Sequence, residues 1–305
     1  MHPVTEWAEV AGNTVIIARD AGEVWFYPFS SLEEEALPFA KPMTCKGTLH
    51  STVGLLDGAI RLAFERTDDQ PAKSDPSPIR YIYSLVGAYY TSKDTPRNLL
   101  RAAKRFEEIG RMAVSRYLKM RAQEEAGHER LALKDLYALG LPAKQIVANC
   151  KPASIRPLCD LFDDYCVQDY PMDAIGFSYC SERIAALKPK AEIDAVKLLF
   201  PDGVDATRFL RSHSSLGSEV SHVEETIEFV SELPASDRIR VVQATYRSAV
   251  LTAERRRLES IKSEVEICEE LDQAAGKELH LLEQAIGWVV ELSCISPSST
   301  TLPQR

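Results

Sequence analysis

Apolar and polar positions follow two different periods along this chain. In the first thirty residues, the runs 13–18 and 23–27 are rich in β-branched and aromatic residues, and a glycine-containing turn separates them. A polar, proline-rich segment at 67–78 then has the composition of a linker. The pattern predicts an N-terminal region with a β-hairpin and linker, a helical bundle domain and a disordered tail, over residues 1–78, 79–296 and 297–305 respectively.

Beyond residue 79, apolar residues recur every three or four positions, which is typical of amphipathic helices. Gly110, Gly140, Pro189 and Pro234 mark helix ends, and Ser236 is an N-cap candidate for the helix after Pro234. The predicted helices cover 96–109, 111–139, 154–168, 173–187, 207–233, a stretch from 236, 250–272 and 276–293. The predicted fold class is therefore mainly α, with a small β-containing N-terminal region.

Carboxylates interrupt apolar stripes on three of these helices. Glu125 shares a stripe with Leu118 and Ala132, because residues seven apart drift only about 20° around a helix. Glu182 shares a face with Ile175 and Tyr179. Glu219 and His222 flank a seam of apolar residues: Leu216, Val220, Val223, Ile227 and Val230. Burying a carboxylate costs several kcal/mol unless a cation or a hydrogen-bond donor compensates for the lost water.

Two of these carboxylates precede a histidine by three residues, in Glu125-Ala-Gly-His128 and Glu219-Val-Ser-His222. Residues three apart lie side by side on one helical face. A bundle that joins two such pairs and a carboxylate from another helix, here Glu182, has the ligand set of a di-iron or di-manganese carboxylate site. The six histidines of the chain offer no better placed pair.

Each candidate ligand also has a simpler interpretation. Glu125 and His128 can belong to an exposed polar cluster, and Glu182 can be neutralised by an arginine in a purely structural ion pair. His213 lies half a turn away from His222 on an ideal helix. It joins the site only if that helix begins late or bulges near Gly217, and a capping or surface role is an equal alternative.

Composition narrows the class of protein. The chain has 305 residues, 45% of them hydrophobic and 27% charged, as in ordinary globular proteins, and a net charge of −9. The negative charge argues against nucleic acid or an anionic membrane as the main partner. Seven cysteines without a Cys-x-x-Cys pair favour reduced thiols, and no apolar run reaches the roughly 20 residues of a membrane span. We expect a soluble cytoplasmic protein.

Three stretches resemble a known group of enzymes. These are Glu-Glu-x-Gly-His-x-x-Leu-x-Leu-x-Asp-Leu-x-x-Leu-Gly (124–140), Tyr-x-x-Glu ending at Glu182, and His-Ser-x-Leu-Gly-x-Glu-x-x-His-Val-Glu-Glu (213–225). Together they resemble the haem-oxygenase-like di-metal oxidases and oxygenases, over roughly residues 80–250. The wider superfamily includes thiaminase-like and pyrroloquinoline-quinone-synthase-like helical proteins.

The resemblance implies a haem-oxygenase-like helical bundle that holds two iron ions per chain, or an iron–manganese pair. It implies O₂ as co-substrate and the oxidation of a small molecule in a biosynthetic pathway. Carried over by position, Glu125 and His128 bind one metal, Glu182 bridges, and Glu219 and His222 bind the second. Relatives often have Asp in place of Glu219 and a further His four residues before it, where this chain has Ser215; His213 is displaced by two residues.

Two other functions stay open at this point. One is a metal-independent enzyme of the same fold, thiaminase-like or quinone-synthase-like, which uses a pocket and acid–base residues. The other is a non-catalytic helical protein whose charged segment 250–275 packs on another chain. A small-molecule substrate is the expected partner in the first two cases, and a homodimer is compatible with all three.

Overall fold

The computed structural model describes residues 4–10, 14–28, 43–44, 46–67, 77–217, 219–281 and 283–284; of Glu219 it describes only the backbone. Most of the predicted linker at 67–78 and the whole predicted tail at 297–305 lie outside these residues. Most of the helix predicted over 276–293 also lies outside the described residues. Residues 276–280, which are described, are not helical. Within the described residues, no helix is both long enough and apolar enough to cross a membrane.

The N-terminal region contains a three-stranded antiparallel sheet in the order β1-β2-β3. The strands are β1 (Thr5–Val10), β2 (Thr14–Arg19) and β3 (Val24–Pro28). The predicted hairpin is confirmed as β2 and β3, which pair from Thr14 opposite Pro28 to Ala18 opposite Val24. Strand β1 adds a partner that the sequence interpretation did not include, and it pairs Thr5 with Arg19.

A long helix that the sequence interpretation missed follows the sheet. Helix α1 (Leu49–Arg66) begins with a capping box in which Thr48 and Ser51 bond each other's backbone N–H. Two glycines on α1 allow the sheet to pack directly on it: a Cβ at Gly54 would lie 2.8 Å from the Cβ of Ala18. Tertiary packing, rather than helix propensity, therefore selects this segment as a helix.

A buried ion pair joins the sheet to the bundle. Arg238 donates through Nε to Glu6 Oε1 over 2.6 Å, and both side chains are buried. Ser51 of α1 also donates to the Glu6 carboxylate. Strand β1, α1 and the long helix that carries Arg238 therefore share one polar contact inside an apolar core.

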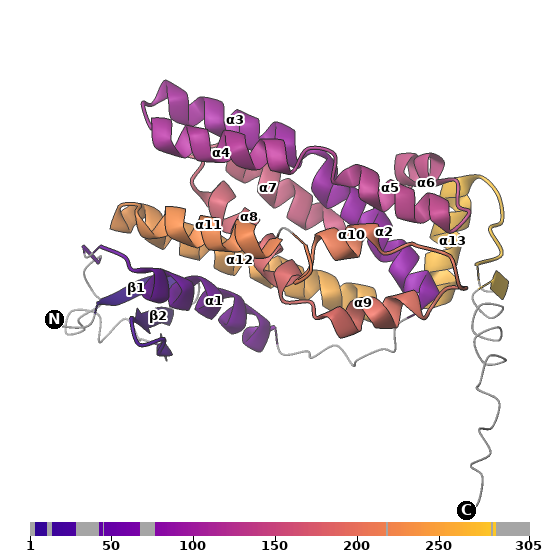
Figure 1. Ribbon diagram of the computed structural model, residues 1–305, viewed down its shortest axis with the longest axis horizontal. Helices are drawn as coiled ribbons and strands as arrows, with labels where there is room; N and C mark the ends of the chain where they lie inside the picture. Colours follow the sequence, from indigo (N-terminus) through magenta and orange to yellow (C-terminus); the bar gives the residue numbers. More distant parts are fainter. Residues whose placement is uncertain are drawn as a thin grey trace, which may run out of the picture.

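The remaining elements form an elongated helical bundle (Figure 1). Their bounds are α2 (Pro78–Lys93), α3 (Thr95–Glu108), α4 (Met112–Glu124), α5 (Glu129–Ala138), α6 (Ala143–Asn149), the 3₁₀ turn η2 (Ala153–Ile155), α7 (Arg156–Val167), α8 (Asp173–Ala186), α9 (Lys190–Lys197), α10 (Arg208–Ser212), α11 (Glu219–Ser231), α12 (Ala235–Ile261) and α13 (Glu264–Ala275). Helix α8 is central and packs on both α11 and α12, while α1 runs along α12. The sheet lies at one end of the bundle, and α6 and α13 lie at the other.

Helix boundaries agree with the prediction in some places and not in others. Helices α3, α7 and α8 match their predicted ranges closely. The predicted Ser236 cap is wrong, because α12 begins at Ala235 and its N-cap, Pro234, has no side-chain cap bond. The helix predicted over 250–272 is two helices, because α12 ends at Ile261 and α13 starts behind a new cap, Ser263.

Two further helix predictions are wrong in a way that shapes the site. The stretch 111–139 is α4 and α5, joined by the turn 125–128, in which Gly127 has φ +95°. The stretch 207–233 contains α10 and α11, and residues 213–217 between them are not helical. At Gly217 a Cβ would lie 1.9 Å from the carbonyl oxygen of Ser212, so the chain can fold back here only with glycine.

Candidate metal centre

The two helix breaks meet in space and bring three predicted ligands together. His128 Nδ1 lies 3.1 Å from Glu125 Oε2 and 3.0 Å from His213 Nε2. One ligand atom from each of the three residues lies within 4.8 Å of the other two. We refer to Glu125, His128 and His213 as the triad.

The first break places two members of the triad. Glu125 caps the C-terminus of α4 and His128 the N-terminus of α5, so both belong to a turn rather than to one helical face. Gly127 between them takes the left-handed conformation that other residues adopt only at a cost. A Cβ at Gly127 would meet nothing closer than Arg130 at 4.0 Å. The backbone turn therefore explains this glycine.

The second break places His213. It caps the C-terminus of α10, six residues before α11 begins at Glu219. The condition for His213 to join the site, a late helix start near Gly217, is therefore met. Its ring stacks on Phe209 with 4.2 Å between centroids and meets the His128 ring edge-on at 4.7 Å.

Asp135 of α5 holds α10 in position. This fully buried carboxylate accepts hydrogen bonds from the backbone N–H groups of Arg208 (3.1 Å) and Phe209 (2.9 Å), and from the Arg208 guanidinium (3.2 Å). The N–H groups at a helix start have no partner within the helix, so an acceptor at this point fixes the helix end. Asp135 thus sets the position of His213 against His128.

Hydrogen bonds and burial assign the protonation states of the triad. Burial alone would raise the pKa of Glu125, but the hydrogen bond with His128 and the nearby positive groups bring it below its usual value. The same hydrogen bond raises the pKa of His128. Burial, with the charge of His128, lowers the pKa of His213 to about 4. His213 is therefore neutral at pH 7, and its Nδ1 lies 3.1 Å from the carbonyl oxygen of Phe209.

The triad has the donor set of a mononuclear non-haem iron site. Two imidazoles and one carboxylate are the facial ligands of many Fe(II) oxygenases, and they leave other coordination positions open. The Phe209 carbonyl fixes the proton of His213 on Nδ1, which directs the lone pair of Nε2 toward the other two ligand atoms. The residues present therefore fit a divalent metal.

A fourth predicted ligand, Glu182, already has a cation. Arg121 of α4 donates through Nη2 to Glu182 Oε1 (2.5 Å) and through Nη1 to Glu124 Oε2 (2.7 Å). The Arg121 side chain is 2% exposed, so this pair is shielded from water. Burial and the charges of Glu125 and Glu124 outweigh the attraction of Arg121 and raise the pKa of Glu182 to about 7.

The last two predicted ligands lie at the start of α11. His222 is buried, and its Nε2 lies 3.9 Å from Glu124 Oε2. The side chain of Glu219 lies outside the described residues. Near Arg121, three buried atoms have no hydrogen-bond partner among the described residues: Glu182 Oε2, His222 Nδ1 and Arg121 Nε. Buried polar atoms are usually hydrogen-bonded, so these three are suited to contact an ion or a water molecule.

Arg121 is the residue of the site that sequence reasoning did not name. It lies four residues before Glu125, so the helical i, i+4 spacing was a usable signal. Its partner Glu182 is 61 residues away, and only the fold brings α4 and α8 together. Glu124 and Glu182 share the Arg121 guanidinium, and the charge of Arg121 also helps to lower the pKa of Glu125.

Comparisons with known proteins agree on the fold. No family model and no curated protein matches the sequence. A domain of unknown function with a haem oxygenase-like fold from Shewanella denitrificans matches with a TM-score of 0.50 and 21% identity, over 77% of this chain and 92% of that one. This chain has a haem-oxygenase-like fold. A TenA homologue from Pseudomonas syringae pv. tomato also matches, with a TM-score of 0.50 and 14% identity, over 70% of this chain and 97% of that one. The predicted fold class is confirmed.

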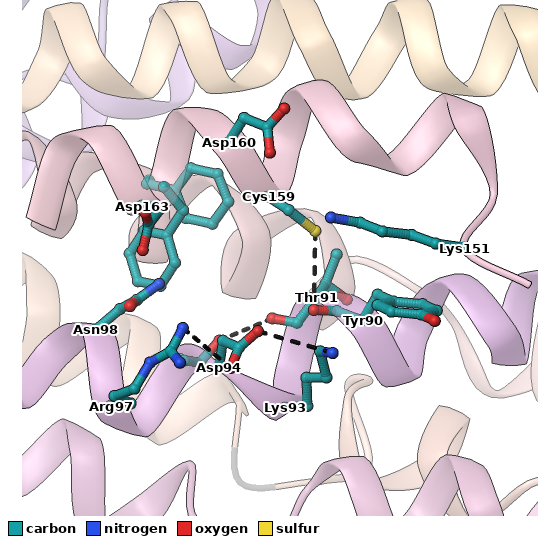
Figure 2. Close-up of a pocket in the computed structure, with 13 residues that line it drawn as sticks. Tyr90, Thr91, Lys93, Asp94, Arg97, Asn98, Lys151, Cys159, Asp160 and Asp163 are labelled. Atoms are coloured by element: carbon teal, nitrogen blue, oxygen red, sulfur yellow. Dashed lines mark hydrogen bonds and ion pairs between the residues drawn. The ribbon is translucent and has the colours of Figure 1, made fainter. Parts of the chain in front are cut away.

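The haem-oxygenase-like bundle encloses a cavity beside the triad. Its volume is about 540 Å³, and Glu125, Glu182 and His213 all contribute to its wall. Volumes of this size are typical of small-molecule sites. A second pocket of about 200 Å³ adjoins it and shares four lining residues, Thr91, Thr95, Phe162 and Phe177. Figure 2 shows this smaller pocket, in which Cys159 Sγ lies 3.8 Å from the carbonyl oxygen of Tyr90.

Proposed function

We propose that this chain is a metal-dependent oxidoreductase that uses O₂ to oxidise a small molecule, with one iron(II) ion held by the triad. The observation that carries the proposal is the convergence of two imidazole nitrogens and a carboxylate oxygen at the wall of a substrate-sized cavity. When bound, iron supplies redox chemistry with O₂ at its open coordination positions.

The chain's own residues bind and orient the reactants. Glu125 and His128 are fixed by the turn around Gly127, and His213 by the Phe209 carbonyl, so the ligands need little rearrangement. Phe162 and Phe177 stack at 4.4 Å and give the cavity an apolar wall. An apolar wall of this kind keeps water away from a reactive oxidant.

The position of Arg121 is the reason why we propose one metal ion and not the two that the sequence predicts. A second ion between Glu182 and His222 would lie beside a buried guanidinium, and two like charges there repel strongly at low dielectric. The ligand roles predicted for Glu182, Glu219 and His222 stay predictions. Binding of a second metal through them requires Arg121 to leave its two carboxylates.

Anaerobic loading with Fe(II), followed by metal analysis, tests the proposal. We expect about one tightly bound iron per chain, from the three-residue donor set. His128→Ala and His213→Ala should each lose this iron and keep their helical circular dichroism. His50→Ala, which changes an exposed histidine, is the matched control and should bind iron as the parent does. Stoichiometric iron in both triad variants would remove these residues from the site.

The metal-independent alternative also has an observation in its favour. Glu182 lines the cavity, and burial raises its pKa to about 7, which suits a general acid or base. A thiolate nucleophile is not favoured among the described cysteines, because burial raises the pKa of each of them above its usual value. If the protein binds no metal at any loading, this alternative takes precedence.

A further inference from the structure

The large cavity contains three cations that the triad does not use. Lys188 lies just after α8, and Arg255 and Arg256 lie on α12; all three line the cavity. Their grouping is notable in a chain whose net charge is −9. Four carboxylates, those of Glu125, Glu182, Glu192 and Glu259, also line the cavity, so an anion is attracted only where a cation lacks a carboxylate partner.

These cations have few partners within the described residues. Arg255 donates to Glu259 Oε1 through Nε (2.8 Å), and its two terminal nitrogens make no hydrogen bond. Arg256 lies over the Phe64 ring at 5.1 Å and has no ion pair there. Lys188 is partly buried, and its ammonium has neither a hydrogen bond nor an ion pair among these residues. Burial and the two arginines lower the pKa of Lys188, and the charge of Glu192 offsets them only in part.

Backbone features fix the position of Lys188 and leave space for Arg255. The carbonyl oxygen of Lys188 accepts a hydrogen bond from Ser215 Oγ (2.9 Å), which ties the end of α8 to the segment after His213. A Cβ at Gly87 would lie 3.0 Å from Arg255 Nη2, so a glycine on α2 leaves space for the guanidinium. The charge of Lys188 also contributes to the lowered pKa of His213, which places the ammonium near the triad.

We propose that the large cavity binds its small molecule through an anionic group, a carboxylate or a phosphate, held by Lys188, Arg255 and Arg256. The rest of the molecule would lie against the apolar wall formed by Phe162, Phe177 and Leu210. As a statement about the substrate this rests on the proposed oxidoreductase function, but the binding step itself does not depend on a metal.

Calorimetric titration of metal-free protein tests the anion site. The probes are octanoate, octyl phosphate and octylamine, which share one apolar tail and differ in the head group. We expect the anionic probes to bind and octylamine to bind at least about tenfold more weakly, because a charge-assisted hydrogen bond contributes roughly the free energy of one decade in affinity. The stronger of the two anionic probes identifies the head group.

Variants locate the site. Lys188→Gln and Arg256→Gln should each weaken the anionic probes about tenfold. Lys190→Gln changes an exposed lysine two residues away, outside the cavity, and should leave the affinity unchanged. Equal affinity for octanoate and octylamine, no anion binding at millimolar concentration, or unchanged affinity in Lys188→Gln would each overturn the proposal. Because the protein is metal-free, these results are independent of whether the triad binds iron.

Discussion

Arg121→Met removes the guanidinium that lies between Glu124 and Glu182 while keeping a long apolar stem. In the parent chain Arg121 makes charge-assisted hydrogen bonds of 2.7 and 2.5 Å to these carboxylates. Glu182 is only 8% exposed in the parent chain, and one of its oxygens has no hydrogen-bond partner among the described residues, so the change leaves it without a cation. Glu124 is 30% exposed and can be solvated by water. The cost therefore falls on Glu182.

The expected loss of stability follows from this burial. Removing one partner of a buried ion pair costs about 3–5 kcal/mol, because the remaining charge is neither solvated nor compensated. The loss should be larger at pH 8 than at pH 6. Removing Arg121 takes away the attraction that lowers the pKa of Glu182, and at pH 6 this carboxyl is protonated with or without Arg121. Arg121→Met with Glu182→Met removes both charges, and the double variant should be more stable than Arg121→Met alone.

Urea unfolding of metal-free protein measures this loss. Arg101→Met is the matched control, because Arg101 and Asp163 form an exposed ion pair with side chains 43% and 50% exposed, which contributes less than about 1 kcal/mol. Iron content is the second readout. Without Arg121 the charge that opposes a second ion is gone, so the variant should bind about two irons where the parent binds one.

Two outcomes would refute this reasoning. A loss below about 1 kcal/mol at pH 8 would mean that Glu182 does not depend on Arg121 for its charge compensation. Iron content that stays the same in parent and variant would mean that Arg121 does not control occupancy of a second site.

Three more predictions follow from the contacts around the triad. Gly127→Ala should destabilise the chain by about 1–2 kcal/mol in urea unfolding, because the left-handed turn is strained for alanine, and it should also weaken iron binding; Gly22→Ala, in the left-handed turn between β2 and β3, should leave iron affinity unchanged. Asp135→Asn should weaken iron binding roughly tenfold to a hundredfold in a chelator competition although it removes no ligand. Stability should fall as pH rises from 4.5 to about 7, because the folded state keeps the Glu182 proton after the unfolded state has lost it; Glu182→Gln should flatten this decline in pH-dependent unfolding.

Burial could be predicted from the sequence better than helix continuity. Leu118 and Ala132 are buried as the seven-residue stripe indicates, although the helix breaks between them. The two residues stay on one side because Glu125 and His128 keep nearly helical dihedral angles, while Gly127 takes a positive φ. Leu216, a member of the predicted apolar seam, is 53% exposed. It lies before the start of α11, so the helical spacing used to predict the seam does not apply to it.

The candidate site, too, could be predicted from the sequence only in part. The Glu-x-x-His spacing identified Glu125 and His128 without any knowledge of the fold. The third triad member, His213, was a conditional candidate because its position depends on the late start of α11, which tertiary contacts decide. An arginine partner for Glu182 was foreseen as an alternative, but Arg121 could not be chosen among the arginines before α4 and α8 were placed together.

A crystal of the Fe(II)-loaded protein, with diffraction collected at the iron absorption edge, tests the central claim most directly. The account predicts one anomalous peak per chain, within bonding distance of Glu125, His128 and His213. No peak at the triad, or a peak only beside Glu182 and His222, would contradict it.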